Sequence, residues 1–293
     1  GLAHELEKPV VALKVGGSDA ARAGTVSHTA SLAGSAAGAR ALLTRLGIGQ
    51  ASSLAVFLET LKLCHVTGPL ASNRVSSMSC SGGEACLVAD AAEGRALEFP
   101  ALTKPQRDGL RAALGARVTL ANPLDYQTDI WGDEDALSAA FTAMMQADLA
   151  LGCVVLDLPR ADRCDPSAWE PVVAAVARAK AATGVPMAIL STLPENLPED
   201  FALRLVELGI VPLAGLSDAV EAMEIATALG HRRNRSEPVL LPASALACRT
   251  LTEAEAKSAL ATHGVRVPAS ARADTPCAAA EAAAQIGFPV VLK

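Results

Sequence analysis

One histidine, His28, lies in the segment GTVSHTASLAGS (residues 24–35), among glycine, alanine and small hydroxyl residues. An imidazole with a pKa of about 6.5 is largely neutral at cytoplasmic pH and nucleophilic at one nitrogen. If a hydrogen bond holds the other nitrogen, the free one can attack phosphorus and form a phosphoramidate. The small neighbours leave room for a phosphoryl group. A loop histidine is more often a solvated bystander, so the segment alone leaves both interpretations open.

Two glycine-containing loops follow strand-like runs. GGSDAARAG comes after VVALKV, and CSGGEA comes after RVSSMS and opens a helix. In parallel α/β sheets, ligands bind at the carboxyl ends of strands, and a helix N-terminus favours an anion there. Any strand-to-helix turn also favours Gly and Ser for geometric reasons, and that reading stays open for each loop taken alone. The phosphate-binding candidates in the two loops are Gly16, Gly17, Ser18, Ser81, Gly82 and Gly83.

Other polar residues near these loops have more modest expected roles. Cys80 precedes a helix N-terminus, where a thiolate would be stabilised, but no histidine base is identifiable beside it, so a packed thiol is expected. Glu84 lies in the first helical turn and is expected to complement the helix dipole. Asn122 and Asp125, in NPLDY, are expected in a turn with Pro123 after a strand, with a contact between subunits or domains as the alternative.

The composition of the chain narrows the class of protein. Its 293 residues are 51% hydrophobic and 3% aromatic, with a net charge of −6, which argues against disorder and against nucleic-acid binding. The seven scattered cysteines include no C-x-x-C pair, so neither a disulfide framework nor a zinc site is indicated. No apolar run reaches the roughly 18 residues of a membrane span. We expect a cytoplasmic homo-oligomer that acts on small molecules.

Short apolar runs alternate with helical patterns along most of the chain. GCVVLDL and VPMAILS have the continuous apolar character of strands in a doubly covered parallel sheet. The alternation predicts an α/β fold with flavodoxin-like, doubly wound parallel sheets. The capping-box sequence of Thr252 and Glu255 opens a helix, which is followed by the helix PCAAAEAAAQIG and a strand, FPVVLK. We expect domains over 1–69 and 70–230, a linker over 231–246 and an incomplete domain over 247–293.

The whole chain resembles the NDP-forming acyl-CoA synthetases, relatives of succinyl-CoA synthetase. KPVVALKVGGSDAARAGTVSHTASLAGS resembles the phosphohistidine segment of that family. SGGEACLVADAAE, NPLDYQTDIWG and GIVPLAGLSDAVEA resemble its succinyl-CoA-ligase-like flavodoxin domain, and residues 251–293 resemble the opening of its ATP-grasp domain. Both ends of the chain look cut, so a fragment of a longer protein is expected.

The resemblance implies an acid–CoA ligase. His28 matches the phosphorylated histidine, and the loop beginning at Ser81 matches a phosphate-facing helix N-terminus. Lys293 resembles a nucleotide-binding lysine of the ATP-grasp domain. The implied cofactors are CoA, ATP or ADP, and Mg²⁺, whose sites lie mostly outside this chain. The alternatives are the ligase-like regulatory part of a protein lysine acyltransferase and a non-catalytic assembly scaffold.

Overall fold

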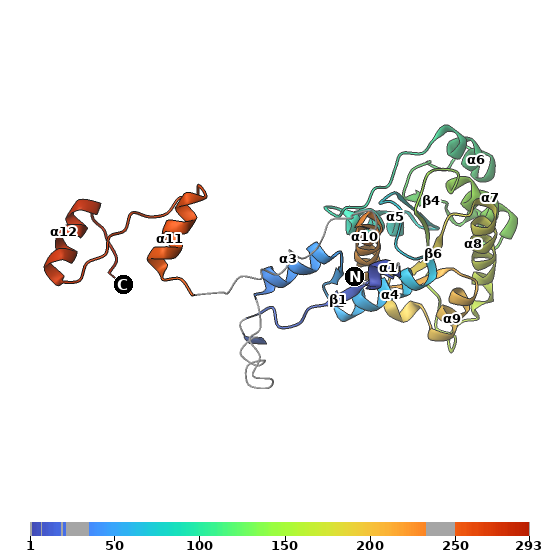
Figure 1. Ribbon diagram of the computed structural model, residues 1–293. Coiled ribbons are helices and arrows are strands. Elements are labelled where there is room, and N and C mark those ends of the chain that lie inside the picture. Colours follow the sequence, from blue (N-terminus) through green and yellow to red (C-terminus); the bar gives the residue numbers. More distant parts are fainter. Residues whose placement is uncertain (1, 7, 19, 22–34, 233–249, 293) are drawn as a thin grey trace. The chain divides into compact units, whose positions relative to one another are not determined.

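The computed structural model describes the whole chain except residues 1, 7, 19, 22–34, 233–249 and 293. Residues 1–239 form one compact unit and residues 240–293 a second (Figure 1). The helices are α1 (Leu2–Glu5), α3 (Ala36–Leu46), α4 (Leu54–Thr67), α5 (Gly82–Ala92), α6 (Lys104–Leu114), α7 (Glu134–Met144), α8 (Glu170–Thr183), α9 (Glu199–Glu207), α10 (Leu216–Arg232), α11 (Glu253–Thr262) and α12 (Pro276–Ile286). The strands are β1 (Val11–Leu13), β2 (Gly49–Ala51), β3 (Val75–Ser79), β4 (Leu124–Asp125), β5 (Leu151–Val155), β6 (Met187–Ser191) and β7 (Val211–Ala214).

The first unit is organised around a five-stranded parallel sheet with the order β4-β3-β5-β6-β7. Renumbered along the sheet, this is the 2-1-3-4-5 order of flavodoxin-like folds. The residues of β3, β5 and β6 are all buried, which explains why their sequences are continuously apolar or small rather than alternating. The predicted flavodoxin-like α/β fold is confirmed.

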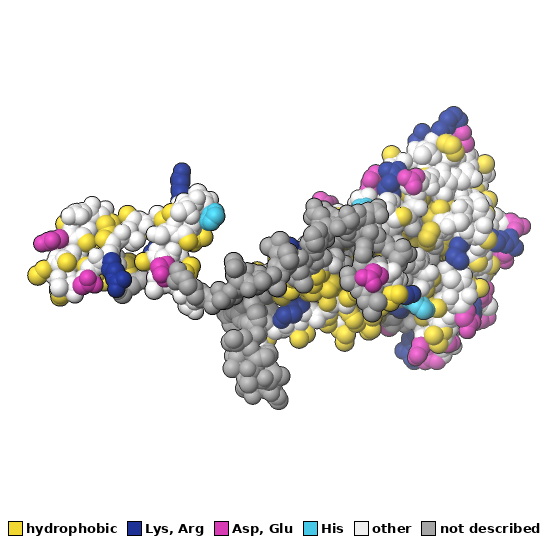
Figure 2. All heavy atoms as spheres, in the orientation of Figure 1, with side chains coloured by type: hydrophobic (Ala, Val, Ile, Leu, Met, Phe, Trp, Pro, Cys, Tyr) yellow, Lys and Arg dark blue, Asp and Glu magenta, His cyan; other side chains and the backbone are white. Residues whose placement is uncertain are grey.

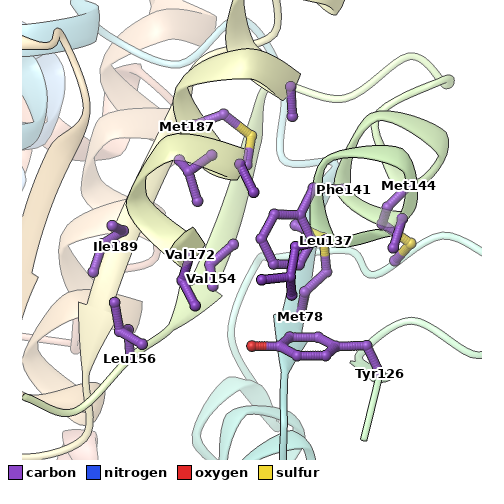
Figure 3. Close-up of a cluster of buried hydrophobic side chains, with 14 of the residues drawn as sticks. Met78, Tyr126, Leu137, Phe141, Met144, Val154, Leu156, Val172, Met187 and Ile189 are labelled. Atoms are coloured by element: carbon purple, nitrogen blue, oxygen red, sulfur yellow. The ribbon is translucent and has the colours of Figure 1, made fainter. Parts of the chain in front are cut away.

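Helices cover both faces of this sheet (Figure 1). Side chains from α7, α8 and α9 pack on one face, with α6 beside α7. Side chains from α4, α5 and α10 pack on the other face. Figure 3 shows the core of the first face, where Phe141 and Leu137 of α7 point toward Val154 on the sheet. Each face therefore buries an apolar stripe of its helices, which is the main source of stability for such a layered fold.

The amino-terminal segment is built into the same unit. Strands β1 and β2 pair in parallel as a separate two-stranded sheet. Helix α4 follows β2 and buries Leu63 among the side chains of the five-stranded sheet. The buried Glu59 of α4 accepts a 2.9 Å hydrogen bond from the N–H of Ala214, at the end of β7. Helix α4 thus contacts both sheets, and the expected boundary at residue 69 stays a prediction.

One close backbone approach fixes the path of the chain after α4. The N–H of Leu70 donates to the carbonyl of Ala226 on α10 at 3.1 Å. A Cβ on Gly230 of the same helix would lie 1.8 Å from the carbonyl oxygen of Leu70. Only glycine lets the two backbones approach so closely, so Gly230 is required where the segment after α4 packs against α10.

An apolar surface accompanies α4. Leu54, Leu58 and Leu61 are exposed on this helix, opposite its buried face. Figure 2 shows hydrophobic side chains gathered on the part of the first unit where α3 and α4 lie.

The second unit contains the helices α11 and α12. The predicted capping box forms: Thr252 accepts from the N–H of Glu255, whose side chain accepts from the N–H of Thr252. The predicted strand FPVVLK is wrong for residues 288–292, which form no strand, and Phe288 and Val291 are exposed. A strand requires a neighbouring strand, and among the described residues none lies beside this segment.

Candidate functional site

The candidate site lies at the carboxyl edge of the five-stranded sheet. The chain leaves β3 and β5 toward opposite faces, since α5 packs on one face and α8 on the other. The point between two such strands is the topological switch point, where ligands bind in open α/β sheets. Ser81, Gly82 and Gly83 follow β3 at this edge and open α5. The fold therefore puts one of the two predicted loops at the carboxyl end of a strand, and phosphate binding there stays a prediction.

The N-terminus of α5 has an open capping box. Ser81 and Glu84 have the spacing of a capping box, but Ser81 makes no side-chain capping bond. The Oε2 atom of Glu84 is buried and has no hydrogen-bond partner among the described residues. In α6 the same arrangement closes, because Thr103 and Gln106 cap one another reciprocally. The first turn of α5 thus keeps N–H groups, a hydroxyl and a carboxyl group that are not used for capping.

Glu84 lies among groups of the same sign. Burial raises its pKa to about 7, and the charges of Asp157 and Asp125 raise it as well. Burial and the two neighbouring carboxylates therefore favour the neutral form of Glu84. The expected complement to the helix dipole stays a prediction.

The two neighbouring carboxylates are held by their own loops. Asp157, which follows β5, accepts from the N–H of Thr192 at 2.8 Å and from its hydroxyl at 2.5 Å. Asp125, at the end of β4, accepts from the N–H of Gln127 at 2.9 Å. The other oxygen of Asp125 lies 3.2 Å from the position that a Cβ on Gly82 would occupy. Glycine at residue 82 thus lets a carboxylate approach the first turn of α5.

A buried tyrosine lies beneath these groups. Tyr126 is only 1% exposed, and its hydroxyl has no hydrogen-bond partner among the residues that the structure describes. Burial raises its pKa strongly, with further contributions from Cys80, Glu84 and Asp125. These contributions place the phenol close to the carboxyl edge, and Figure 3 shows its ring beside Met78. A buried hydroxyl without a partner is costly, so this one requires a partner that the described residues do not supply.

The thiol of Cys80 lies among the same acidic groups. Burial raises its pKa above the usual value, and the negative charges of Glu84, Asp125 and Asp157 oppose its ionisation further. Its side chain packs against the core of the sheet. The prediction of a packed thiol agrees with this setting, because a nucleophilic cysteine needs a lowered pKa.

Asn122 has a structural role. Its side-chain oxygen accepts from the N–H of Ser77 at 3.2 Å, and its amide nitrogen donates to the carbonyls of Val75 and Pro100 at 3.0 and 3.3 Å. Strand β4 pairs with β3 only at Met78 and Ser79, so the Asn122 side chain satisfies the part of β3 that β4 does not reach. The sequence predicts a turn here, and the structure adds this connection to β3.

The remaining predicted site residues lie elsewhere. Gly16, Gly17 and Ser18 follow β1, at the end of the two-stranded sheet, and the hydroxyl of Ser18 accepts from the N–H of Ala21 at 3.2 Å. His28 and Lys293 lie outside the described residues. The convergence of the two loops and His28 on one phosphate stays a prediction.

No group of three or more His, Cys, Asp or Glu side chains that could hold a metal ion occurs within the described residues. Within the same part of the chain, no helix has the length and apolar character of a membrane span. Tyr126, Asp157 and Thr192 lie beside the candidate site, and sequence reasoning did not identify them. Only the position of Asp157 directly after a predicted strand could have indicated one of them.

Comparison with known proteins agrees with this architecture. Residues 2–64 match a model of the succinyl-CoA ligase like flavodoxin domain, and residues 243–293 match an ATP-grasp domain. A trans-feruloyl-CoA synthase from an unknown prokaryotic organism is 26% identical over 99% of this chain and 41% of its own length. These matches show that the chain is similar to the NDP-forming acyl-CoA synthetase family.

Two further relatives show the same similarity. The alpha subunit of an ADP-forming acetate–CoA ligase II from Pyrococcus furiosus is 33% identical over 44% of this chain and 28% of its own length. The dinucleotide-forming acetyl-coenzyme A synthetase 1 of Ca. Korarchaeum cryptofilum, solved with phosphate and ADP, shares the fold with a TM-score of 0.65. That structure is 17% identical and aligns with 79% of this chain and 49% of its own. The chain spans less than half of the length of the feruloyl-CoA synthase and of the acetate–CoA ligase subunit.

Proposed function

We propose that this chain is part of an NDP-forming acid–CoA ligase. The observation that carries the proposal is the glycine turn at Ser81, which lies at the switch point of a flavodoxin-like sheet and leaves the first turn of α5 uncapped. Such a turn suits an oxyanion, because its N–H groups and the helix dipole are available to the ligand. The curated relatives that match the chain are named as CoA ligases or a CoA synthase, which supports the same activity.

The reaction proceeds through a phosphohistidine. Acyl-CoA and phosphate give an acyl phosphate and free CoA. A ring nitrogen of His28 then attacks the phosphorus, the bond from phosphorus to the acyl oxygen breaks, and the carboxylic acid leaves. ADP takes the phosphoryl group from His28 to give ATP, and each step is reversible. The chain supplies the nucleophile and the anion-binding turns, while Gly16, Gly17 and Ser18 support the loop that precedes His28.

The ligands of the ligase are a carboxylic acid or its acyl-CoA, CoA, and ATP or ADP. The match of residues 243–293 to an ATP-grasp domain supports nucleotide binding, with Lys293 as a contact to the nucleotide. Mg²⁺ would accompany the nucleotide and neutralise charge on its phosphates.

The proposal also covers the assembly and the domains of the protein. The ligase acts in the cytoplasm as a homo-oligomer. The chain contains domains over residues 1–69 and 70–230, and the segment 231–246 links them to the ATP-grasp region at 247–293.

Phosphorylation of the full-length protein tests this function. Incubation with ATP labelled at the γ-phosphate should give an acid-labile, base-stable label, and His28→Ala should abolish it. His65→Ala is the matched control, since His65 lies on α4 and has no place in the proposed relay. Labelling that survives in His28→Ala would contradict the relay. Acyl-CoA binding without any labelling would favour the regulatory part of an acyltransferase, and calorimetry that shows no binding of CoA or nucleotide would favour a scaffold.

A further inference from the structure

The open capping box at α5 indicates what Glu84 does. Of the two Ser/Thr-x-x-Glu/Gln sequences that open helices of the first unit, at residues 81–84 and 103–106, only the second forms its reciprocal hydrogen bonds. A glutamate at this position normally accepts from the N–H of the capping residue. Glu84 instead leaves Oε2 buried and without a partner. Its carboxyl group is therefore available to a ligand at the helix N-terminus.

A second observation points to the same space. The hydroxyl of Tyr126 is buried and unpartnered, and Glu84, Asp125 and Cys80 all act on it electrostatically. Two buried polar atoms without a partner among the described residues, one from α5 and one from the residue after β4, thus belong to groups that interact electrostatically. Buried polar groups are almost always paired, so both atoms require a polar partner that the described residues do not supply.

The charges around this space restrict the ligand. The titratable groups that act on Glu84 are Asp157 from the loop after β5 and Asp125 from the end of β4, and Cys80 and Tyr126 adjoin it. An ionised Glu84 would repel an oxyanion at the N-terminus of α5. A neutral Glu84 would instead donate its proton in a hydrogen bond to that oxyanion, as protonated carboxyl groups do in apolar sites.

We propose that Glu84 is a ligand-contacting residue that, as a neutral carboxylic acid, donates a hydrogen bond to an oxyanion held at the N-terminus of α5. The inference rests on the proposed function, because that function supplies the oxyanion. The shared chemistry is a phosphate or carboxylate oxygen, from inorganic phosphate, from the acid substrate, or from their acyl phosphate. Binding then takes up a proton from solvent whenever Glu84 is ionised in the free protein.

The size of the effect follows from the protonation of Glu84. Its pKa of about 7 in the free protein gives neutral fractions of about 0.9 at pH 6 and 0.1 at pH 8. If only the neutral form binds, the apparent Kd rises about tenfold between these pH values. Glu84→Gln keeps a donor and cannot ionise, so its affinity should be independent of pH.

Sulfate binding to the full-length protein tests this inference. Sulfate stays a dianion from pH 6 to pH 8, whereas phosphate titrates in this range. All proteins in this measurement carry His28→Ala, because an imidazole with a pKa of about 6.5 beside the anion would itself make binding depend on pH. In this background, calorimetry should show about tenfold weaker binding at pH 8 than at pH 6, and the same with Glu93→Gln, which removes a carboxylate at the far end of α5. Addition of Glu84→Gln should make binding equal at both pH values. Competition with phosphate and with acetate at pH 6 then identifies which oxyanion source uses the site.

The outcomes separate this inference from the proposed function. The role of Glu84 would be overturned if Glu84→Gln left the pH dependence of sulfate binding unchanged. It would also be overturned if sulfate binding to protein with Glu84 intact did not depend on pH. Neither result would affect the labelling of His28. Normal sulfate behaviour without a label on His28 would overturn the relay and leave the Glu84 contact standing. Absence of sulfate binding at both pH values would overturn the oxyanion site itself.

Discussion

Replacement of Tyr126 by phenylalanine should stabilise the protein, although it removes a polar atom near the candidate site. The hydroxyl is buried without a partner, and its desolvation costs about 1–3 kcal/mol. The void left by one oxygen costs only a few tenths of a kcal/mol at about 24 cal/mol per Å³. The ring keeps its edge contact with Phe141, at 5.4 Å between centroids. The net expectation is a gain of about 1 kcal/mol in the free energy of unfolding.

Urea denaturation followed by tryptophan fluorescence measures this gain. Trp131 and Trp169, the only two tryptophans, both pack against the core that contains Tyr126, so their emission reports on this unit. With an m-value of about 2–3 kcal/mol/M, the midpoint should rise by about 0.3–0.5 M. Tyr126→Leu, which also removes the aromatic contact, should lower it instead. A fall of the midpoint in Tyr126→Phe would show that the hydroxyl has a partner and would refute the reasoning.

Three further predictions concern stability, each measured by the same denaturation. Glu84 has an unfolded pKa of 4.5 and a folded pKa of about 7, so its contribution to stability is present below pH 4.5 and is lost as the pH rises through 7. After discounting for solvent screening, this loss of stability is about 1–2 kcal/mol. Glu84→Gln should abolish the loss. An equal difference in the free energy of unfolding between pH 5 and pH 8 in the wild type and in Glu84→Gln would contradict this expectation. Asn122→Ala leaves the buried N–H of Ser77 unpaired and should cost about 2–3 kcal/mol, whereas a cost below about 0.5 kcal/mol would show that water replaces the amide. Gly230→Ala should lower the free energy of unfolding by more than about 3 kcal/mol, because its Cβ would lie 1.8 Å from the carbonyl oxygen of Leu70. This clash outweighs the gain of about 1 kcal/mol in helix propensity. An unchanged urea midpoint would contradict the close approach.

The sequence predicts most of the layered fold because its elements are locally specified. The apolar runs around β5 and β6 and the caps of α6 and α11 depend on residues close in sequence. The segment from residue 117 to 126 shows the limit of such reasoning, since only Leu124 and Asp125 form a strand there. The Asn122 side chain hydrogen-bonds to the part of β3 that β4 does not reach. No local sequence pattern indicates that a side chain replaces the backbone pairing there. Residues 288–292 are similar, because a strand depends on a neighbour and not on its own sequence alone.

The position of the candidate turn could be predicted from the sequence, because Ser81 follows a strand. The pKa of Glu84 could not, because it depends first on burial and then on Asp157 and Asp125, which are 73 and 41 residues farther along the chain. The local Ser-x-x-Glu pattern favours a closed capping box, and the structure leaves it open. Such departures from a local pattern are expected where a site has a function.

The approach of Asp125 to Gly82 has a consequence for anion binding. Its carboxylate already lies in the positive field at the start of α5, so the free protein contains its own competitor for incoming anions. An anion that enters must work against this resident charge, which weakens its binding. In the proposed ligase, such competition would limit inhibition by a released phosphate or acid.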